Sequence, residues 1–246
     1  MATSNSLPND SQGPEHRLSM ATENYLLSIF QLEEMGVSVT STQLAEQLKR
    51  LPAGEGLGTS LPSVSGMLRR MVRENLVKTT PTKDVLLTSK GRSSAESIVR
   101  RHRLAERMVV DLLGLELHKA HVEAHRLEHA ISTELEEKIA ARLGNPATCP
   151  FGHPIPGSGY VSPEHAFPLS SARPGQKLVI DRVPEEDQAL LEYFVSSELT
   201  PGELIEVVEA APYRGVMKLT CNENEVVVGY EVAERIWVHS ETTHRD

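Results

Sequence analysis

Three stretches near the N-terminus place apolar residues at helical spacing. The first, residues 22–35, carries an apolar stripe of tyrosine, leucine, isoleucine and phenylalanine and stops at Gly36. The second begins near Ser41, and the third has Pro62 in its first turn, where proline is favoured. The spacing therefore predicts three short helices in the first third of the chain.

Two strand-like runs follow the third predicted helix, at residues 76–80 and 85–89, and a Pro-Thr-Lys-Asp turn joins them. Three helices followed by a β-hairpin are typical of the winged helix-turn-helix, which reads DNA with its third helix. A glycine-rich loop within residues 51–60 precedes that helix and is unusual for the motif. A three-helix bundle that binds no DNA is the alternative interpretation of the same pattern.

The middle of the chain is again helical. One predicted helix runs from Ser89 to Gly114 with apolar residues on more than one face, and a second covers about residues 118–130. A third ends at the sequence Gly144-Asn145-Pro146. Helices that are joined by short turns and carry this much apolar surface favour a dimer interface.

The pattern changes again after residue 148. Residues 149–175 are rich in proline, glycine and serine, which predicts a linker, and five short alternating runs beyond them predict a small β-barrel interrupted by one helix. The expected fold class is mainly α with a small β-barrel. The expected parts are a disordered tail, a winged helix-turn-helix domain, a helical dimerisation and metal-binding domain, a linker and a barrel, at residues 1–18, 19–92, 93–148, 149–175 and 176–240.

Composition predicts a soluble globular protein. Hydrophobic residues make up 39% of the chain and charged residues 24%, and no apolar run approaches the ~20 residues that span a bilayer. The polar N-terminus lacks the apolar core of a signal peptide. The cysteines, Cys149 and Cys221, lie far apart, which argues against a disulfide framework. The expected compartment is therefore the cytoplasm, without membrane contact.

The net charge of −9 is unevenly distributed along the chain. Residues 44–107 hold 13 Lys and Arg against 6 Asp and Glu, whereas the residues from 111 onward hold 11 against 23. A basic segment joined to an acidic body is a pattern of nucleic-acid binders. Because the basic excess coincides with the predicted winged helix, it favours DNA binding over chance clustering on a solvated face.

Imidazoles and carboxylates gather on one stripe of the two middle helices. His102 and Glu106 lie four residues apart on the first helix, so they project from one face. On the second helix, His121, His125 and His129 follow one another at steps of four, with a glutamate directly before the last. Neutral imidazole and carboxylate are ligands of borderline-to-hard divalent metals, so the stripe predicts one or two metal sites.

Taken together, these motifs resemble one known family, the diphtheria toxin repressor (DtxR/MntR) family of metal-dependent transcriptional regulators. The carrying segments are TENYLLSIFQLEEMGV, RHRLAERMVVDLLGL, HVEAHRLEHAIS and CPFGHPIPG. The resemblance covers nearly the whole chain from about residue 20. It implies a homodimer with a winged-helix reader, a helical dimerisation region and a Src-homology-3-like barrel, with a divalent metal as co-repressor or activator of DNA binding.

The resemblance also implies two sets of metal ligands. The first set, called site one here, is His102, Glu106, His121, Glu185 and Gln188. The second set, called site two, is His125, Glu128, His129 and Asn24, with Glu23 as a substitute for Asn24. Asn24 and His125 stand where iron-responsive members have a methionine and a cysteine. Because this loss of soft sulfur favours manganese, the expected type is manganese-responsive.

The expected cofactor is therefore Mn²⁺, with Fe²⁺ as the alternative, while Zn²⁺, Co²⁺ or Cd²⁺ can occupy such sites in vitro. The expected partners are a second copy of the chain and a palindromic double-stranded DNA operator. The expected DNA-contacting residues are Ser41, Thr42, Ser60, Pro62, Ser63, Ser65, Gly66, Arg69, Arg70, Arg73 and Lys83. The implied role is that of a repressor of metal-ion homeostasis genes.

Two other functions could use the same ligands. A metallohydrolase would hold its metal with an open coordination position, but the sequence has no HExxH spacing. A metal-storage protein would have no need of an arginine-rich reading helix. The sequence therefore predicts a regulator and not an enzyme.

Overall fold

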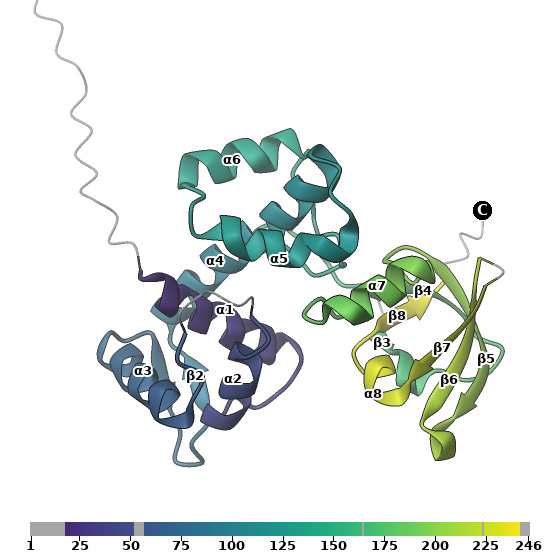
Figure 1. Ribbon diagram of the computed structural model, residues 1–246, viewed down its shortest axis with the longest axis horizontal. Coiled ribbons are helices and arrows are strands. Elements are labelled where there is room, and N and C mark those ends of the chain that lie inside the picture. The colour runs from purple at the N-terminus through teal and green to yellow at the C-terminus, as the bar shows by residue number, and fades with distance from the viewer. Residues whose placement is uncertain (1–17, 52–56, 164, 223, 242–246) are drawn as a thin grey trace, which may run out of the picture.

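The computed structural model describes residues 18–51, 57–163, 165–222 and 224–241 and arranges them in three parts (Figure 1). The reading domain consists of three helices and a hairpin. It lies on one side of a middle group of helices, and a β lobe lies on the other side. The predicted disordered tail, except Leu18, and the centre of the glycine-rich loop fall outside the described residues. No described helix is long and apolar enough to cross a membrane.

The reading domain has the predicted order of elements. Ser19 and Ser60 each cap a helix by accepting a hydrogen bond from the backbone N–H three residues later. Thr40 and Gln43 form a reciprocal capping box at the start of the second helix. The elements are α1 (Met20–Glu34), α2 (Ser41–Leu48), α3 (Leu61–Arg73), β1 (Val77–Thr79) and β2 (Val85–Leu87).

Helix α4 (Ser89–Arg107) fixes the reading domain to the middle of the molecule. Its Ile98 and Val99 are buried in the same apolar cluster as the core of the reading domain. Gly91 allows α4 to approach the hairpin closely, because a Cβ there would lie 1.8 Å from the carbonyl oxygen of Leu76. The first half of α4 therefore belongs to the reading domain, and its second half bears two of the predicted ligands, His102 and Glu106.

The middle helices carry most of the predicted ligands. After α4 comes a π-helical segment, η1 (Met108–Leu112), and Gly114 then adopts a left-handed φ of 70°. Helix α5 (Leu117–Glu128) packs against α4, and α6 (Thr133–Arg142) follows from a serine cap. This packing places the histidines of α5 opposite the ligand-bearing face of α4.

The β lobe is a six-stranded antiparallel sheet with the strand order β3-β8-β4-β5-β6-β7. Its strands are β3 (Phe167–Pro168), β4 (Lys177–Arg182), β5 (Leu204–Ala211), β6 (Val216–Cys221), β7 (Asn224–Gly229) and β8 (Trp237–Ser240). Its helical segments are η2 (Leu169–Ser171), α7 (Gln188–Ser196), η3 (Pro212–Arg214) and α8 (Tyr230–Ala233).

Two features of this lobe differ from the expectation. The sheet has six strands and not five, because the two-residue strand β3 within the proline-rich stretch pairs with β8. Residues 149–175 are also more than a linker, since Cys149 and Phe151 are buried in one cluster with Leu178 and Val238 of the sheet. The apolar side chains within this Pro- and Gly-rich stretch anchor it to the lobe.

The β lobe packs against the middle helices. Val109 of η1 and Ala120 of α5 belong to the buried cluster of the lobe, and α5 contacts α7 directly. This docking brings the loop of residues 183–187, which connects β4 to α7, close to the histidines of α5.

Candidate metal centre

Four of the five residues predicted for site one come together. His102 and Glu106 lie one turn apart on α4, His121 faces them from α5, and Glu185 reaches them from the loop after β4. All four are buried, and one potential ligand atom from each lies within 4.8 Å of the others. The Nε2 atom of His102 is 2.9 Å from Oε1 of Glu106 and 3.2 Å from Nδ1 of His121. Ligands that lie ~2.1 Å from one cation have such separations.

Gln188, the fifth predicted residue, lies outside this cluster. Its side chain is exposed at the start of α7 and donates a hydrogen bond to Glu192 over 3.2 Å. Together with His121 and Glu185 it lines a cleft of about 610 Å³, which His118 also lines. Gln188 is therefore at the entrance of site one and not within it.

The residues predicted for site two form a second, adjoining group. His129 Nδ1 lies 2.7 Å from Glu23 Oε2, and His129 Nε2 lies 3.1 Å from Asn24 Oδ1. The Oε1 atom of Glu128 is 3.3 Å from His129 Nε2 and 3.4 Å from His125 Nδ1. Glu23 and Asn24, the two alternatives for one ligand position, therefore both face His129.

His102 and His125 connect the two groups. His102 Nδ1 is 2.5 Å from Glu128 Oε2, so one imidazole contacts a carboxylate of each site. The ring centre of His125 lies 4.6 Å from that of His102 and 4.7 Å from that of His121. Apart from Gln188, the two predicted sets thus form one continuous cluster of imidazole, carboxylate and amide groups.

Burial and neighbouring charges have opposite effects on the pKa values of His102 and Glu106. Burial disfavours the charged form of His102, but Glu106 and Glu128 outweigh it and hold its pKa well above the usual value. Burial also disfavours ionised Glu106, yet the histidines His102 and His121 hold its pKa well below the usual value. Each ring nitrogen of His102 thus faces a carboxylate oxygen of the cluster, Nε2 that of Glu106 and Nδ1 that of Glu128.

The pKa of His125 is shifted downward, in contrast to that of His102. Burial lowers its pKa to about 4, so the ring is neutral and offers a lone pair. Burial opposes the ionisation of Glu128, but His125 and His102 outweigh it and lower the pKa of Glu128 to about 2. A neutral imidazole beside an ionised carboxylate is the protonation state that binds a divalent cation.

Several buried atoms of the cluster lack the hydrogen bonds that buried polar atoms normally make. Among the described residues, Glu106 Oε2, Glu128 Oε1 and both ring nitrogens of His125 have no hydrogen-bond partner. Glu128 Oε1 lies 3.4 Å from His125 Nδ1, but this contact is not aligned as a hydrogen bond. Such orphaned atoms cost about 1–3 kcal/mol each. Their nitrogen and carboxylate chemistry fits a divalent metal such as Mn²⁺, Fe²⁺ or Zn²⁺.

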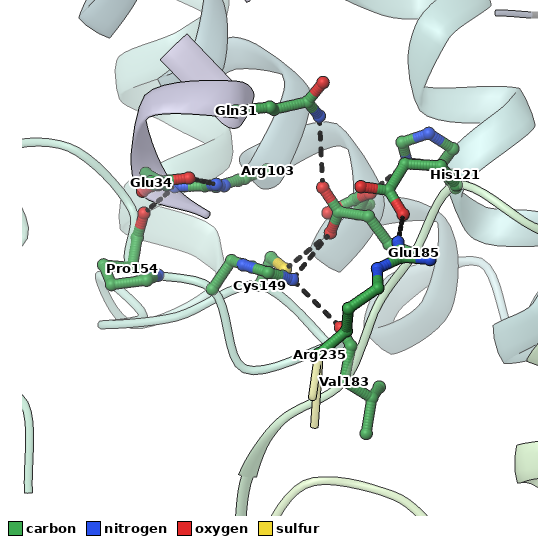
Figure 2. A network of polar contacts seen from close by, with 12 residues as sticks. Gln31, Glu34, Arg103, His121, Cys149, Pro154, Val183, Glu185 and Arg235 are labelled. Carbon is green, nitrogen blue, oxygen red and sulfur yellow. Dashed lines mark hydrogen bonds and ion pairs between the residues drawn. The ribbon is translucent and has the colours of Figure 1, made fainter. Parts of the chain in front are cut away.

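Three residues outside the predicted ligand sets surround Glu185, and Figure 2 shows two of them, Gln31 and Cys149, beside it. Gln31 of α1 donates a hydrogen bond to its Oε1 atom over 3.3 Å. The Sγ atom of Cys149 and the Nε2 atom of His153 each lie 3.7 Å from its Oε2 atom. Burial and two neighbouring carboxylates raise the pKa of Cys149 well above the usual value, so the sulfur is a thiol and donates. Gln31 follows Asn24 by seven residues on one helix face, a spacing that could have pointed to it.

The predicted DNA-contacting residues fall into two groups. A groove of about 740 Å³ between α3 and the hairpin is lined by Ser41, Ser65, Gly66, Arg69, Arg73 and Lys83. Outside this groove, but still exposed, are Thr42, Ser60, Pro62, Ser63 and Arg70. Val72 also lines the groove, with 43% of its surface exposed. Thr79 of β1 is a further lining residue that the sequence reasoning missed.

A buried cluster of imidazoles and carboxylates, joined to a winged-helix reader with a basic groove, defines the class of metal-responsive DNA-binding proteins. Family descriptions match each part of the chain. "Iron dependent repressor, N-terminal DNA binding domain" matches residues 17–85, and "Iron dependent repressor, metal binding and dimerisation domain" matches residues 88–157. "FeoA domain" matches residues 167–240, beginning at β3.

Individual relatives agree with these matches. The diphtheria toxin repressor of Corynebacterium glutamicum is 40% identical over 145 residues, 59% of this chain and 60% of that protein. The iron-dependent repressor IdeR of Mycobacterium leprae is 42% identical over 136 residues, 55% of each protein. A manganese-dependent transcriptional repressor, solved in complex with manganese, is 32% identical with a TM-score of 0.79 over 89% of this chain and 100% of that one.

The chain therefore belongs to the diphtheria toxin repressor family of metal-dependent repressors, which are DNA-binding regulators and not enzymes. Its alignments span little more than half the length of the two curated relatives, whereas its fold covers the whole solved manganese-dependent repressor. The expected fold of a DNA-binding domain, dimerisation helices and a Src-homology-3-like lobe is confirmed. The metallohydrolase alternative is wrong for this family.

Proposed function

We propose that this protein is a manganese-dependent repressor of metal-ion homeostasis genes that acts in the cytoplasm as a homodimer on a palindromic operator. In this proposal His102, Glu106, His121 and Glu185 form site one, with Gln188 at its entrance. Site two is formed by His125, Glu128 and His129 together with Asn24 or Glu23. The boundaries of the functional parts follow the predicted domains, except that the β lobe begins at β3.

The main support for this proposal is that the proposed ligands come from three different parts of the molecule. Asn24 comes from the reading domain, His102 and His129 from the middle of the molecule, and Glu185 from the β lobe. A divalent cation at each site supplies positive charge to the buried carboxylates, so that site one joins the middle of the molecule to the β lobe and site two joins it to the reading domain. The three parts then keep one relative arrangement, which fixes the spacing and tilt of the two α3 helices in a dimer.

The groove beside α3 supports DNA as the partner. Arg69 and Arg73 on its wall and Lys83 at the tip of the hairpin can contact phosphates, which position a reader on the duplex. Ser65 is small enough to let the helix approach base edges. Val72, exposed in the same groove, offers an apolar contact for a thymine methyl group.

Exposed apolar side chains on the middle helices support a homodimer. Leu112 and Leu113 at the end of η1 are 43% and 70% exposed, and Leu135 of α6 is 46% exposed. Large apolar groups left in water on neighbouring elements are typical of protein interfaces. A two-fold dimer presents its reading helices about 34 Å apart, which is one turn of DNA.

Manganese is the proposed metal because the described ligands are nitrogen and oxygen. Site two has no sulfur donor, and the sulfur near site one, Cys149, is a buried thiol that donates to Glu185. Carboxylate, amide and imidazole ligands suit Mn²⁺, although it binds most weakly in the series of divalent metals. The second candidate is a regulator that responds to Fe²⁺, because a relative with 42% identity is named as an iron-dependent repressor.

Retention of genomic DNA fragments on the purified protein tests this function. The protein is loaded with Mn²⁺, with Fe²⁺ under anaerobic conditions, or with a chelator, and random-sequence DNA serves as the control. We expect fragments that share a palindrome to be retained only with metal, and more strongly with Mn²⁺ than with Fe²⁺ when each metal saturates the sites. Retention that is independent of metal, or equal for random DNA, would contradict the proposal.

A further inference from the structure

Helix α1 contacts the β lobe through a hydrogen bond that the ligand sets do not explain. Gln31 Nε2 donates to Glu185 Oε1 over 3.3 Å, between residues 154 positions apart in the chain. Both side chains are buried, with 5% of Gln31 and 2% of Glu185 exposed. We propose that Gln31 is a positioning residue that holds Glu185 at site one and couples the position of Glu185 to the reading domain. This inference rests on the proposed role of Glu185 as a ligand.

Glu185 is fixed to the β lobe independently of Gln31. Its second carboxylate oxygen lies 3.7 Å from the thiol of Cys149, on the side opposite Gln31 (Figure 2). The next residue, Glu186, forms an ion pair with Arg235 of the lobe. The loop that carries Glu185 therefore moves with the lobe, and the hydrogen bond from Gln31 ties this loop to α1.

Helix α1 contacts the metal cluster at a second point, two turns before Gln31. Asn24 Oδ1 lies 3.1 Å from Nε2 of His129. Residues seven apart lie on the same face of a helix and about 10 Å apart along its axis. One face of α1 therefore meets site two at Asn24 and the site-one ligand Glu185 at Gln31. Because α1 also packs against α2, these two contacts together set the orientation of the reading domain.

A carboxamide is the suitable side chain for this contact. It donates a hydrogen bond to Glu185 without carrying a charge. A carboxylate at position 31 would repel Glu185, and an ammonium group there would form an ion pair that competes with a cation. Gln31 thus orients Glu185 and leaves its negative charge for the metal.

The change Gln31→Met tests the coupling, because methionine keeps the side-chain length and lacks the donor. Gln47→Met is the matched control, at a glutamine of α2 that is 4% exposed. Mn²⁺ titration of the full chain in a His129→Ala background isolates site one. We expect Gln31→Met to weaken Mn²⁺ binding there about tenfold, and Gln47→Met to leave it unchanged.

Amide hydrogen exchange at saturating Mn²⁺, with His129 intact, is the second readout. In the wild type, metal is expected to slow exchange both in residues 30–34 of α1 and in residues 183–187 of the lobe. In Gln31→Met the protection of residues 183–187 remains and that of residues 30–34 is lost. Gln31→Asn keeps the amide but is too short to reach Glu185, and it is expected to behave like Gln31→Met. This variant shows whether the hydrogen bond itself is needed or whether any polar side chain at position 31 is sufficient.

The two ways in which this test can fail are distinguishable. If both Gln31 variants keep wild-type Mn²⁺ affinity and wild-type protection of residues 30–34, the inference is overturned while the proposed function stands. If His129→Ala protein with Gln31 intact takes up no Mn²⁺, the assignment of site one is wrong, and the inference falls with it.

Discussion

At the scale of single residues, His102 is the point at which the two sites meet. Its Nε2 atom faces Glu106 and His121, and its Nδ1 atom faces Glu128. A carboxylate on the second nitrogen of a ligand histidine fixes the ring and makes it a stronger ligand. In the proposed assignment Glu128 therefore serves both sites, as a neighbour of His102 in one and as a ligand in the other.

His125 is the residue that bears most directly on metal preference. Its ring is buried and neutral, with a pKa that burial lowers to about 4. We expect His125→Cys to shift the ratio of Mn²⁺ to Zn²⁺ affinity toward zinc by at least about tenfold, because a thiolate prefers the softer metal. Competition titration of purified protein with the two metals measures this ratio.

A cysteine placed elsewhere is the control for that change. His239→Cys on β8 adds a thiol outside both sites and is expected to leave the ratio unchanged. An unchanged ratio in His125→Cys would mean that His125 does not bind the metal.

At the scale of elements, the arginines of α3 are not equivalent. Arg69 lines the groove, whereas Arg70 is held by Glu74 one turn later, with 2.8 Å between Nε and Oε1. We expect Arg69→Ala to weaken operator binding and to reduce the salt dependence by about one counterion, while Arg70→Ala has the smaller effect. Fluorescence anisotropy at several salt concentrations measures both. Equal losses in the two variants would show that this groove is not the DNA-binding face.

Two arginines of α4 hold the end of α1 in different surroundings. Arg103 is 1% exposed and forms a paired contact with Glu34, whereas Arg92 is 43% exposed and pairs with Glu33. We expect Arg103→Met to lower the free energy of unfolding by about 3 kcal/mol, because it leaves a partly buried carboxylate without its partner. Arg92→Met is expected to cost less than about 1 kcal/mol, as for other exposed pairs. Urea denaturation measures the free energy of unfolding of both variants. Equal losses would show that the buried pair of Arg103 and Glu34 does not hold α1 more strongly than the exposed pair of Arg92 and Glu33.

Local chemistry explains why most elements could be predicted from the sequence. The serine and threonine caps, Pro62 and Gly36 mark helix ends by interactions within one turn. Strand β3 could not be found in this way, because its two residues are held only by pairing with β8, about 70 residues away.

The same distinction applies to the candidate site. The histidines of α4 and α5 stand at helical spacing, so their common face was evident, and the family resemblance pointed to Glu185. The contact of Gln31 with Glu185 and the burial of Cys149 arise only from tertiary packing.

At the scale of the whole molecule, the proposed ligands come from three parts, so the proposed function makes metal binding and reader orientation one equilibrium. A ligand shifts such an equilibrium only by its difference in affinity for the two arrangements. Under the proposed function, Mn²⁺ and operator DNA therefore strengthen each other's binding by the same factor. Typical couplings of 1–3 kcal/mol correspond to roughly 5–150-fold.

The most direct test is a titration of operator affinity with Mn²⁺, followed by anisotropy, for the wild type and for Glu128→Ala combined with His129→Ala. We predict that Mn²⁺ raises wild-type operator affinity by at least about fivefold, and that operator DNA raises Mn²⁺ affinity by the same factor. The double variant should remain folded and dimeric by circular dichroism and sedimentation but show no response. Wild-type protein that binds Mn²⁺ with no change in operator affinity would contradict the account.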